Sequence, residues 1–195
     1  RPRGARLVSI AGEARARLAA GLTLLSPWVP LVFMGEEWAA STPFHFFADY
    51  GDARLLRDVA RGRAEEQRGF GWQVEPSDPA PGDRRAMERS RLDWSERSEG
   101  AHARMLDWYR SLLELRRQRA DLCDPDPASV RAWCDAQSDA VVLERAQTLV
   151  VARRGEGTGR LTVSAREILV ASGDVRLEGG TLALGPSSFA VLARP

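Results

Sequence analysis

The 195-residue chain contains neither lysine nor asparagine, and it has only two cysteines and two histidines. All 28 positive charges are therefore arginines, and against 27 acidic residues they leave a formal net charge of +1. Proteins that bind nucleic acid or an anionic membrane usually carry a clear basic surplus. The balance of charge therefore predicts neither kind of partner.

Long apolar runs are also missing. No stretch approaches the roughly 20 apolar residues that a membrane span requires, and the first residues lack the pattern of a secretory signal peptide. Cys123 and Cys134 do not have the C-x-x-C spacing of redox or zinc sites, and two unpaired thiols are typical of a reducing compartment. His45 and His102 are too far apart to predict a metal pair. We expect a cytoplasmic protein without a metal or cofactor.

The most informative segment is 30–47. Its residues 31–34 form a continuous apolar run that Gly35 ends, the pattern of a strand covered on both faces in a parallel sheet. Glu36, Glu37 and Trp38 follow directly. In α/β folds the binding site lies at the carboxyl ends of the strands, so this strand end is the candidate site.

Carboxylates beside aromatic rings suit a sugar ligand, because its CH faces stack on rings while its hydroxyls bind charged acceptors. Adjacent side chains on an extended backbone point in opposite directions, so only one of the two glutamates should face the site. The other is expected to pair with an arginine. The aromatic residues after Trp38 either form a sugar platform or pack the loop onto the scaffold. Asp49 either accepts a sugar hydroxyl or caps a turn. The candidate substrate-binding residues are Glu36, Glu37, Trp38, Phe47 and Asp49.

Helical patterns surround this segment. Residues 12–25 predict a mostly buried helix that Pro27 ends, and Asp52 can cap a second, surface helix through about residue 67. Residues 73–100 have no sustained period and predict an irregular loop. Apolar residues at helical spacing then predict a helix around residues 105–119.

A period of two replaces the helical period after a proline-containing linker at 121–127. Short segments of this kind, several of them separated by glycine-rich turn signals, predict an antiparallel β-sandwich. The candidate strands are 129–134, 140–144, 148–152, 160–163, 167–171, 174–177, 181–184 and 188–193. The chain therefore divides into residues 1–121 and 122–195.

Several segments of residues 1–121 together resemble a known family. They are 33–38, 42–49, 61–63, 70–72, 90–94 and 108–117. This set is similar to the end of the catalytic barrel in the α-amylase superfamily of glycoside hydrolases, and most closely to the malto-oligosyltrehalose trehalohydrolases. The resemblance implies an α/β plus all-β fold: residues 1–121 as the last α-β-α elements of a (β/α)₈ TIM barrel, and residues 122–195 as a small antiparallel β-sandwich.

The same resemblance implies an activity and a missing part. Such enzymes act in trehalose biosynthesis and cleave the α-1,4 bond next to the trehalose unit of malto-oligosyltrehalose. They use three acidic residues, and the resemblance implies that all three would lie before Arg1. A complete barrel needs roughly 250 residues, which agrees with a carboxyl-terminal fragment. No catalytic residue is therefore assigned here, and the chain alone is expected to be inactive.

Two alternatives remain. Gly-Glu-Glu and Leu-Asp-Trp segments also look similar to those of glycogen-branching or debranching enzymes. In a non-enzymatic alternative, the terminal sandwich binds glucan or braces a partner, although Trp133 is its only tryptophan.

Overall fold

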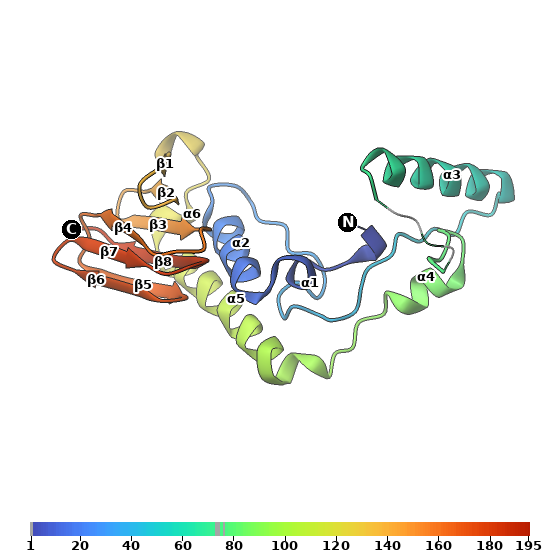
Figure 1. Cartoon of the computed structure of the whole chain (residues 1–195), viewed down its shortest axis with the longest axis horizontal. Coiled ribbons are helices and arrows are strands. Elements are labelled where there is room, and N and C mark those ends of the chain that lie inside the picture. The colour runs from blue at the N-terminus through green and yellow to red at the C-terminus, as the bar shows by residue number, and fades with distance from the viewer. Residues whose placement is uncertain (1, 73–74, 76) are drawn as a thin grey trace.

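The computed structural model describes residues 2–72, 75 and 77–195. Figure 1 shows an elongated molecule with its strands at one end and helices α3 and α4 at the other. Helices α2 and α5 lie beside the strands. Among the described residues, no helix is both long enough and apolar enough to cross a membrane.

The amino-terminal part begins with a 3-10 turn at Pro2–Gly4, followed by helices α1 (Leu7–Ala11) and α2 (Glu13–Leu25). Gly12, with φ of 82°, separates the two helices. The predicted helix at 12–25 is present and stops before Pro27, whereas the short helix α1 was not predicted.

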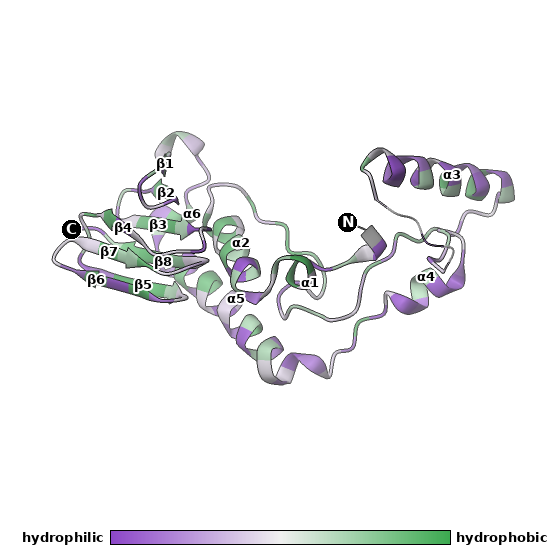
Figure 2. Ribbon diagram, viewed as in Figure 1, coloured by the Kyte–Doolittle hydropathy of each residue, from purple (hydrophilic) through white to green (hydrophobic). Residues whose placement is uncertain are grey.

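Helix α3 (Ala53–Gly69) begins as the sequence indicated, because the Asp52 carboxylate accepts hydrogen bonds from the backbone N–H groups of Arg54 and Leu55. Figure 2 shows purple and green residues alternating along it, as in an amphipathic surface helix. The irregular loop predicted for 73–100 is wrong in part. Helix α4 (Arg84–Arg89) forms within it, capped by Asp83, followed by a 3-10 turn at Glu96–Ser98. Residues 73, 74 and 76 of this loop lie outside the described residues.

Helix α5 (Gly100–Gln118) is the long helix predicted around 105–119, and it buries Met105, Trp108, Tyr109 and Leu112. Helix α6 (Ala120–Cys123) and a 3-10 turn at Pro127–Ser129 occupy the linker. The proposed boundary between residues 121 and 122 therefore falls inside a short helix.

All of the candidate strands form, with bounds shifted by at most two residues. They are β1 (Arg131–Asp135), β2 (Ala140–Glu144), β3 (Thr148–Arg153), β4 (Gly159–Thr162), β5 (Glu167–Ser172), β6 (Val175–Glu178), β7 (Thr181–Leu184) and β8 (Ser188–Ala193). One sheet has the order β1-β2-β3-β8-β5 and the other the order β4-β7-β6. Every pairing is antiparallel, and a register shift interrupts β5 between Ile168 and Val170.

The two central strands of the five-stranded sheet, β3 and β8, are buried on both faces. One face packs against the three-stranded sheet through residues such as Val142, Leu182 and Leu192. The other packs against the helices, where Phe189 and Val191 of β8 meet Leu24 of α2 and neighbouring residues of α5. The alternation along β8 thus separates two apolar cores, and the strand part of the chain shares one of them with the helical part.

The strand predicted at 31–34 is not formed. Leu31 is 85% exposed, and Val32, Phe33 and Met34 are also exposed, in a segment outside both sheets. A strand exists only where a neighbouring strand accepts its backbone hydrogen bonds, and the described residues supply no parallel partner. The prediction of a buried strand at 31–34 is therefore wrong for the described structure, because the pairing that makes a strand is missing.

Candidate functional site

The Gly-Glu-Glu-Trp segment forms a series of turns over residues 34–39. Gly35 has φ of +81°, and a Cβ placed on it would lie 2.7 Å from Leu92 Cδ2 and 2.9 Å from Ala40 Cβ. Only glycine combines this backbone conformation with so close an approach. Gly35 therefore ends the apolar run because the turn at this position requires a glycine.

Arg6 holds the two ends of this loop together. Its Nε donates to the Thr42 carbonyl at 2.7 Å and its Nη1 to the Met34 carbonyl at 2.8 Å. The guanidinium carbon also lies 5.5 Å from the centre of the Phe33 ring. Because Arg6 is 6% exposed, these charge-assisted bonds lie in a shielded place and should stabilise the loop strongly.

A cavity of about 540 Å³ lies between this loop, helix α3 and residues 78–81. Its wall includes the rings of Phe33, Phe44 and Phe46 and the polar side chains of Arg6, Glu36 and Arg63. The volume is in the range of about 300 to 1,000 Å³ found for small-molecule sites, and a mostly apolar wall with a few polar groups is their usual chemistry.

Glu36 is fixed on this wall from two directions. Its Oε2 accepts a hydrogen bond from the Phe33 backbone N–H at 3.2 Å, and the Tyr109 hydroxyl donates to its carboxylate. Burial, together with the charges of Glu36 and Glu37, raises the pKa of Tyr109 above its ordinary value of 10.0. The tyrosine is therefore a protonated donor at neutral pH, and it orients the carboxylate toward the cavity.

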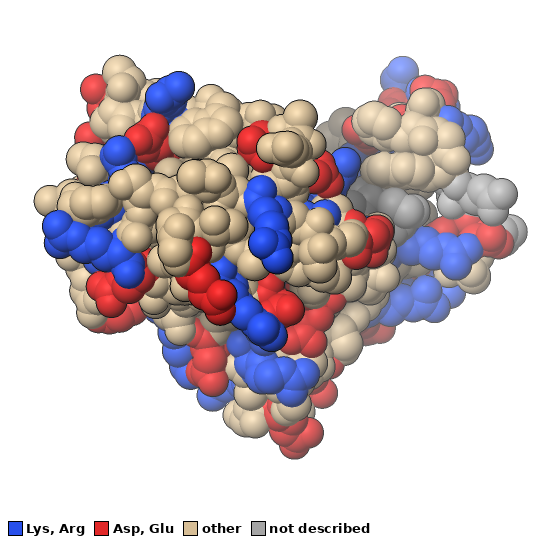
Figure 3. Space-filling view, turned by 60° about the vertical axis from the view of Figure 1, so that its left-hand side comes forward, with Lys and Arg blue, Asp and Glu red and all other residues tan. Residues whose placement is uncertain are grey.

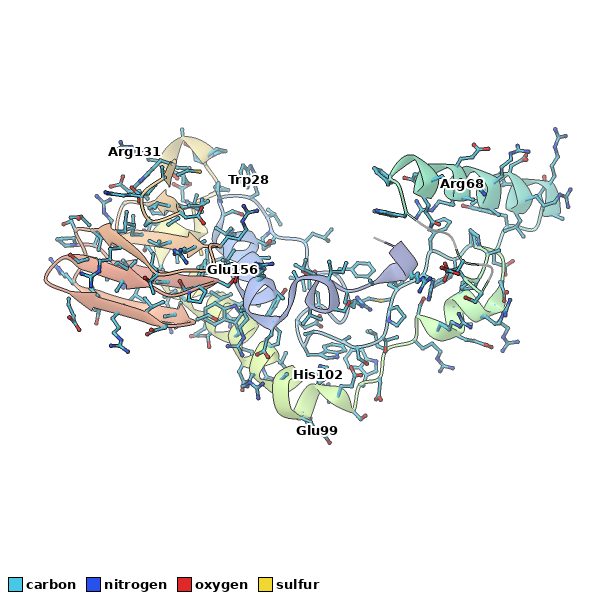
Figure 4. The ribbon with its side chains drawn as sticks, in the orientation of Figure 1. Trp28, Arg68, Glu99, His102, Arg131 and Glu156 are labelled. Atoms are coloured by element: carbon cyan, nitrogen blue, oxygen red, sulfur yellow. The ribbon has the colours of Figure 1, made fainter. Side chains whose placement is uncertain are left out.

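Glu37 and Trp38 do not line the cavity. Trp38 is 2% exposed, and its ring centre lies 4.9 Å from that of Trp94. The Trp38 carbonyl is 3.0 Å from Nδ1 of His102. His102 lies at the start of α5 (Figure 4). The Oε2 of Glu37 is buried and has no hydrogen-bond partner among the described residues. The arginine partner expected for the second glutamate is likewise not found in the described part of the chain.

The two remaining candidates also lie outside the cavity wall. Phe47 is 41% exposed and packs its ring 5.8 Å from Phe44, and Asp49 is exposed. Phe44 and Phe46 thus line the cavity, while Phe47 lies on the surface, and the choice between a sugar platform and loop packing stays a prediction.

The residues on α3 were not recognised as site residues from the sequence. Ala60, Arg63, Ala64 and Gln67 all face the cavity, and the Arg63 guanidinium lies 4.8 Å from the centre of the Phe46 ring. Their spacing of three, four and seven residues marks one helix face, which was the available signal. Nothing in the sequence showed which partner this face would meet.

His45 borders the same cavity. Its backbone N–H donates to Ser90 Oγ at 2.9 Å, which fixes the main chain at this position. Burial, assisted by Arg89 and opposed by Asp78, lowers the pKa of His45 below its ordinary value of 6.5. The imidazole is therefore neutral at pH 7. No cluster of three or more potential metal ligands occurs among the residues described.

The sequence and the fold of the chain were compared with those of known proteins. No family model matches the chain. The malto-oligosyltrehalose trehalohydrolase of Brevibacterium helvolum is 38% identical over 197 aligned residues, covering 98% of this chain and 33% of that protein. The enzyme of the same name from Rhizobium sp. is 38% identical over 180 residues, covering 90% of this chain and 29% of the relative.

A solved structure described as a putative alpha amylase from Salmonella typhimurium aligns with a TM-score of 0.80 and 28% identity, covering 100% of this chain and 33% of that one. The chain thus spans about a third of the length of these proteins. The resemblance inferred from the sequence is confirmed: the chain is related to the malto-oligosyltrehalose trehalohydrolases of the α-amylase superfamily, and it matches their carboxyl-terminal part.

Proposed function

We propose that the chain is the carboxyl-terminal part of a glycoside hydrolase that releases trehalose from malto-oligosyltrehalose. The observation that carries this proposal is the 38% identity to the Brevibacterium helvolum trehalohydrolase over 98% of the chain. In a retaining glycosidase one carboxylate attacks the anomeric carbon, while a carboxylic acid about 5 to 5.5 Å away protonates the leaving oxygen. We assign these acids to the part of the enzyme that precedes this chain.

The same proposal gives the exposed apolar segment a role. Residues 31–34 would be the last strand of a (β/α)₈ barrel, between α2 and α5, with its parallel neighbours supplied by the preceding part of the enzyme. The exposure of Leu31, Phe33 and Met34 supports this, because apolar side chains in an extended segment are normally covered. Residues 1–121 would complete the barrel, and residues 122–195 would form the β-sandwich domain.

Within this enzyme we propose Glu36 as the substrate contact. Its position on the cavity wall and its fixed carboxylate support that role. Glu37, Trp38, Phe47 and Asp49 remain proposed contacts for the assembled enzyme, where other parts of the protein adjoin them. The buried Trp38 favours a supporting role for that residue.

A cytoplasmic location fits this metabolic role, and the free, exposed thiols of Cys123 and Cys134 support a reducing compartment. The distribution of charge supports a neutral substrate. On the face shown in Figure 3, positive and negative side chains are interspersed, without a large region of one sign.

A chimeric enzyme tests the proposal. This chain replaces the matched part of the Brevibacterium helvolum relative, and trehalose release from malto-oligosyltrehalose is measured. We expect release by the chimera and none by the chain alone. A folded chimera that forms α-1,6 branches instead of releasing trehalose would favour the branching-enzyme alternative.

Two variants of the chimera separate the glutamates. Glu36→Gln should lower kcat/KM roughly tenfold or more, because it removes a charged hydrogen-bond acceptor from the cavity wall. Glu37→Gln should change mainly the melting temperature. Equal kinetic and thermal effects of the two substitutions would contradict this division.

A further inference from the structure

A cluster of buried polar side chains lies at the junction between the helical part and the strands, around the turn that joins β2 to β3. Arg145 in this turn is 2% exposed, and its Nη1 donates to the Asp124 carbonyl of the linker at 3.0 Å. In the opposite direction, the Asp121 carboxylate of α6 accepts a hydrogen bond from the Gln147 backbone N–H at 3.0 Å. The linker and the turn therefore bind each other through reciprocal hydrogen bonds.

Four side-chain atoms of this cluster are buried and have no hydrogen-bond partner among the described residues. They are Arg145 Nε, Arg145 Nη2, Asp121 Oδ1 and Thr148 Oγ1. Thr148 is 0% exposed and begins β3, where alternation places its side chain on the same face as Val150. Val150 belongs to the core shared with the helices, which also contains Leu122 of α6. Thr148 therefore faces the side of the sheet on which α6 packs.

The charges around Arg145 are balanced. Burial and the charge of Arg116 lower the pKa of Arg145 below its ordinary value of 12.5, whereas the charges of Asp121 and Asp124 oppose this change. Two arginines and two aspartates leave no surplus of positive charge. An anion in the cluster would also be repelled by the carboxylates, so the charges favour a neutral ligand.

The hydrogen-bonding capacity of the four atoms matches that of one water molecule. Nε and Nη2 form one edge of the planar guanidinium, so a single oxygen atom can accept from both N–H groups. The two hydrogens of the same water can be donated to Asp121 Oδ1 and Thr148 Oγ1. Buried waters in proteins typically make about three hydrogen bonds to polar groups of this kind. Without such a ligand, each of these buried groups would destabilise the folded state.

We propose that Arg145, Asp121 and Thr148 form a binding site for one ordered water molecule, which links α6 to the turn and to the first residue of β3. The bound water thus helps to fix the strands on the helical part of the chain. This inference goes beyond the proposed function, because it concerns how the two parts are joined and does not depend on the substrate.

Water-selective NMR on the 195-residue chain, labelled with ¹⁵N-arginine, tests the site. We expect the Arg145 Nε–H proton to give a signal with a cross peak to water. The cross peak should differ in sign between NOE and ROE spectra, which distinguishes a bound water from proton exchange. Arg145→Lys keeps the charge and assigns the signal by its loss. Buffers with and without chloride should give the same cross peak.

A substitution at Thr148 gives a second, independent measurement. Thr148→Val replaces the buried hydroxyl with a methyl group of similar size. If the water is bound, it loses a partner, and we expect the melting temperature to fall by about 3 to 5 °C. A hydroxyl without any partner would give the opposite sign, because its removal would relieve an unpaired polar group. Thr162 is exposed on β4, so Thr162→Val is the matched control and should shift the melting temperature by less than about 2 °C.

Each outcome supports or overturns the site. The water cross peak, together with a lower melting temperature of Thr148→Val, supports it. An Arg145 Nε–H signal without a water cross peak overturns it, as does a higher melting temperature of Thr148→Val. Loss of the signal through rapid exchange would show that the cluster is open to solvent, and a cross peak that chloride removes would show an anion instead of water. Both of these results also overturn the site, whether or not the chimera releases trehalose.

Discussion

Gly21 of α2 lies directly against the Phe189 ring of β8. A Cβ added at Gly21 would lie 2.5 Å from two carbon atoms of that ring, closer than real Cβ contacts allow. Phe189 is fully buried and also meets Trp108 edge to face at 5.8 Å. The missing side chain of the glycine thus lets α2 approach the five-stranded sheet, and this contact joins the helical and strand parts of the chain.

Gly21→Ala should therefore destabilise the protein even though alanine is the better helix former. The helix gains about 1 kcal/mol from the substitution, whereas overpacking a filled core costs about 1 to 3 kcal/mol. We expect a net loss of up to about 2 kcal/mol in the free energy of unfolding, measured by urea denaturation. Gly62→Ala on α3 is the control, since nothing lies within 4 Å of its Cβ position. It should stabilise by about 0.5 to 1 kcal/mol, and a stabilising Gly21→Ala would show that the interface yields.

Arg116 should be important for stability because it binds the carboxyl end of α2. Its guanidinium donates to the carbonyls of Leu24, Ser26 and Trp28, the last two at 3.2 Å. Figure 4 labels Trp28 in the chain that leaves α2. Arg116→Met should lower the free energy of unfolding by about 2 kcal/mol, because these acceptors lose a charged donor.

Its neighbour Arg117 provides the comparison. The Arg117 side chain is 74% exposed and pairs only with Glu114 on the same helix, among the described residues. Arg117→Met should change stability by less than about 0.5 kcal/mol. Similar losses in the two variants would mean that helix α5 simply needs the charge.

His45 should make stability depend on pH. Its pKa in the folded protein lies below 6.5, so the unfolded chain takes up the proton first as the pH falls. The contribution is fully present above pH 6.5 and is lost as the pH falls toward the lower folded pKa. His45→Gln should consequently lose less stability than the parent chain between about pH 8 and pH 5. Urea midpoints at both values measure this, and parallel losses in the two proteins would refute it.

The rate of amide hydrogen exchange should distinguish the unpaired segment 29–34 from the packed helices and strands. We expect fast exchange through 29–34, which belongs to no described helix or strand, and slow exchange in β3, β8 and the buried turns of α2 and α5. The helices should share the protection of the strands because they share a core. Slow exchange of 29–34 in a monomer would show that this segment has found a partner within the chain.

Local patterns were sufficient to predict most of the elements. Alternating apolar residues predicted all eight strands, because one side of each strand must face a core. Asp52 predicted the start of α3, and Gly35 predicted the end of the apolar run, because both effects act within a few residues. The short helix α4 was missed because six residues are too few for a recognisable period.

The site required the tertiary structure. The sequence placed two glutamates and a tryptophan after an apolar run, and only the fold showed that Glu36 meets the cavity while Trp38 packs inward on Trp94. Arg63 of helix α3 meets Phe46 of the preceding loop, a contact that no periodicity encodes. The sequence of 31–34 likewise could not show which partner the segment would meet. Apolar residues can favour an extended, buried segment, but a strand forms only where another strand accepts its hydrogen bonds.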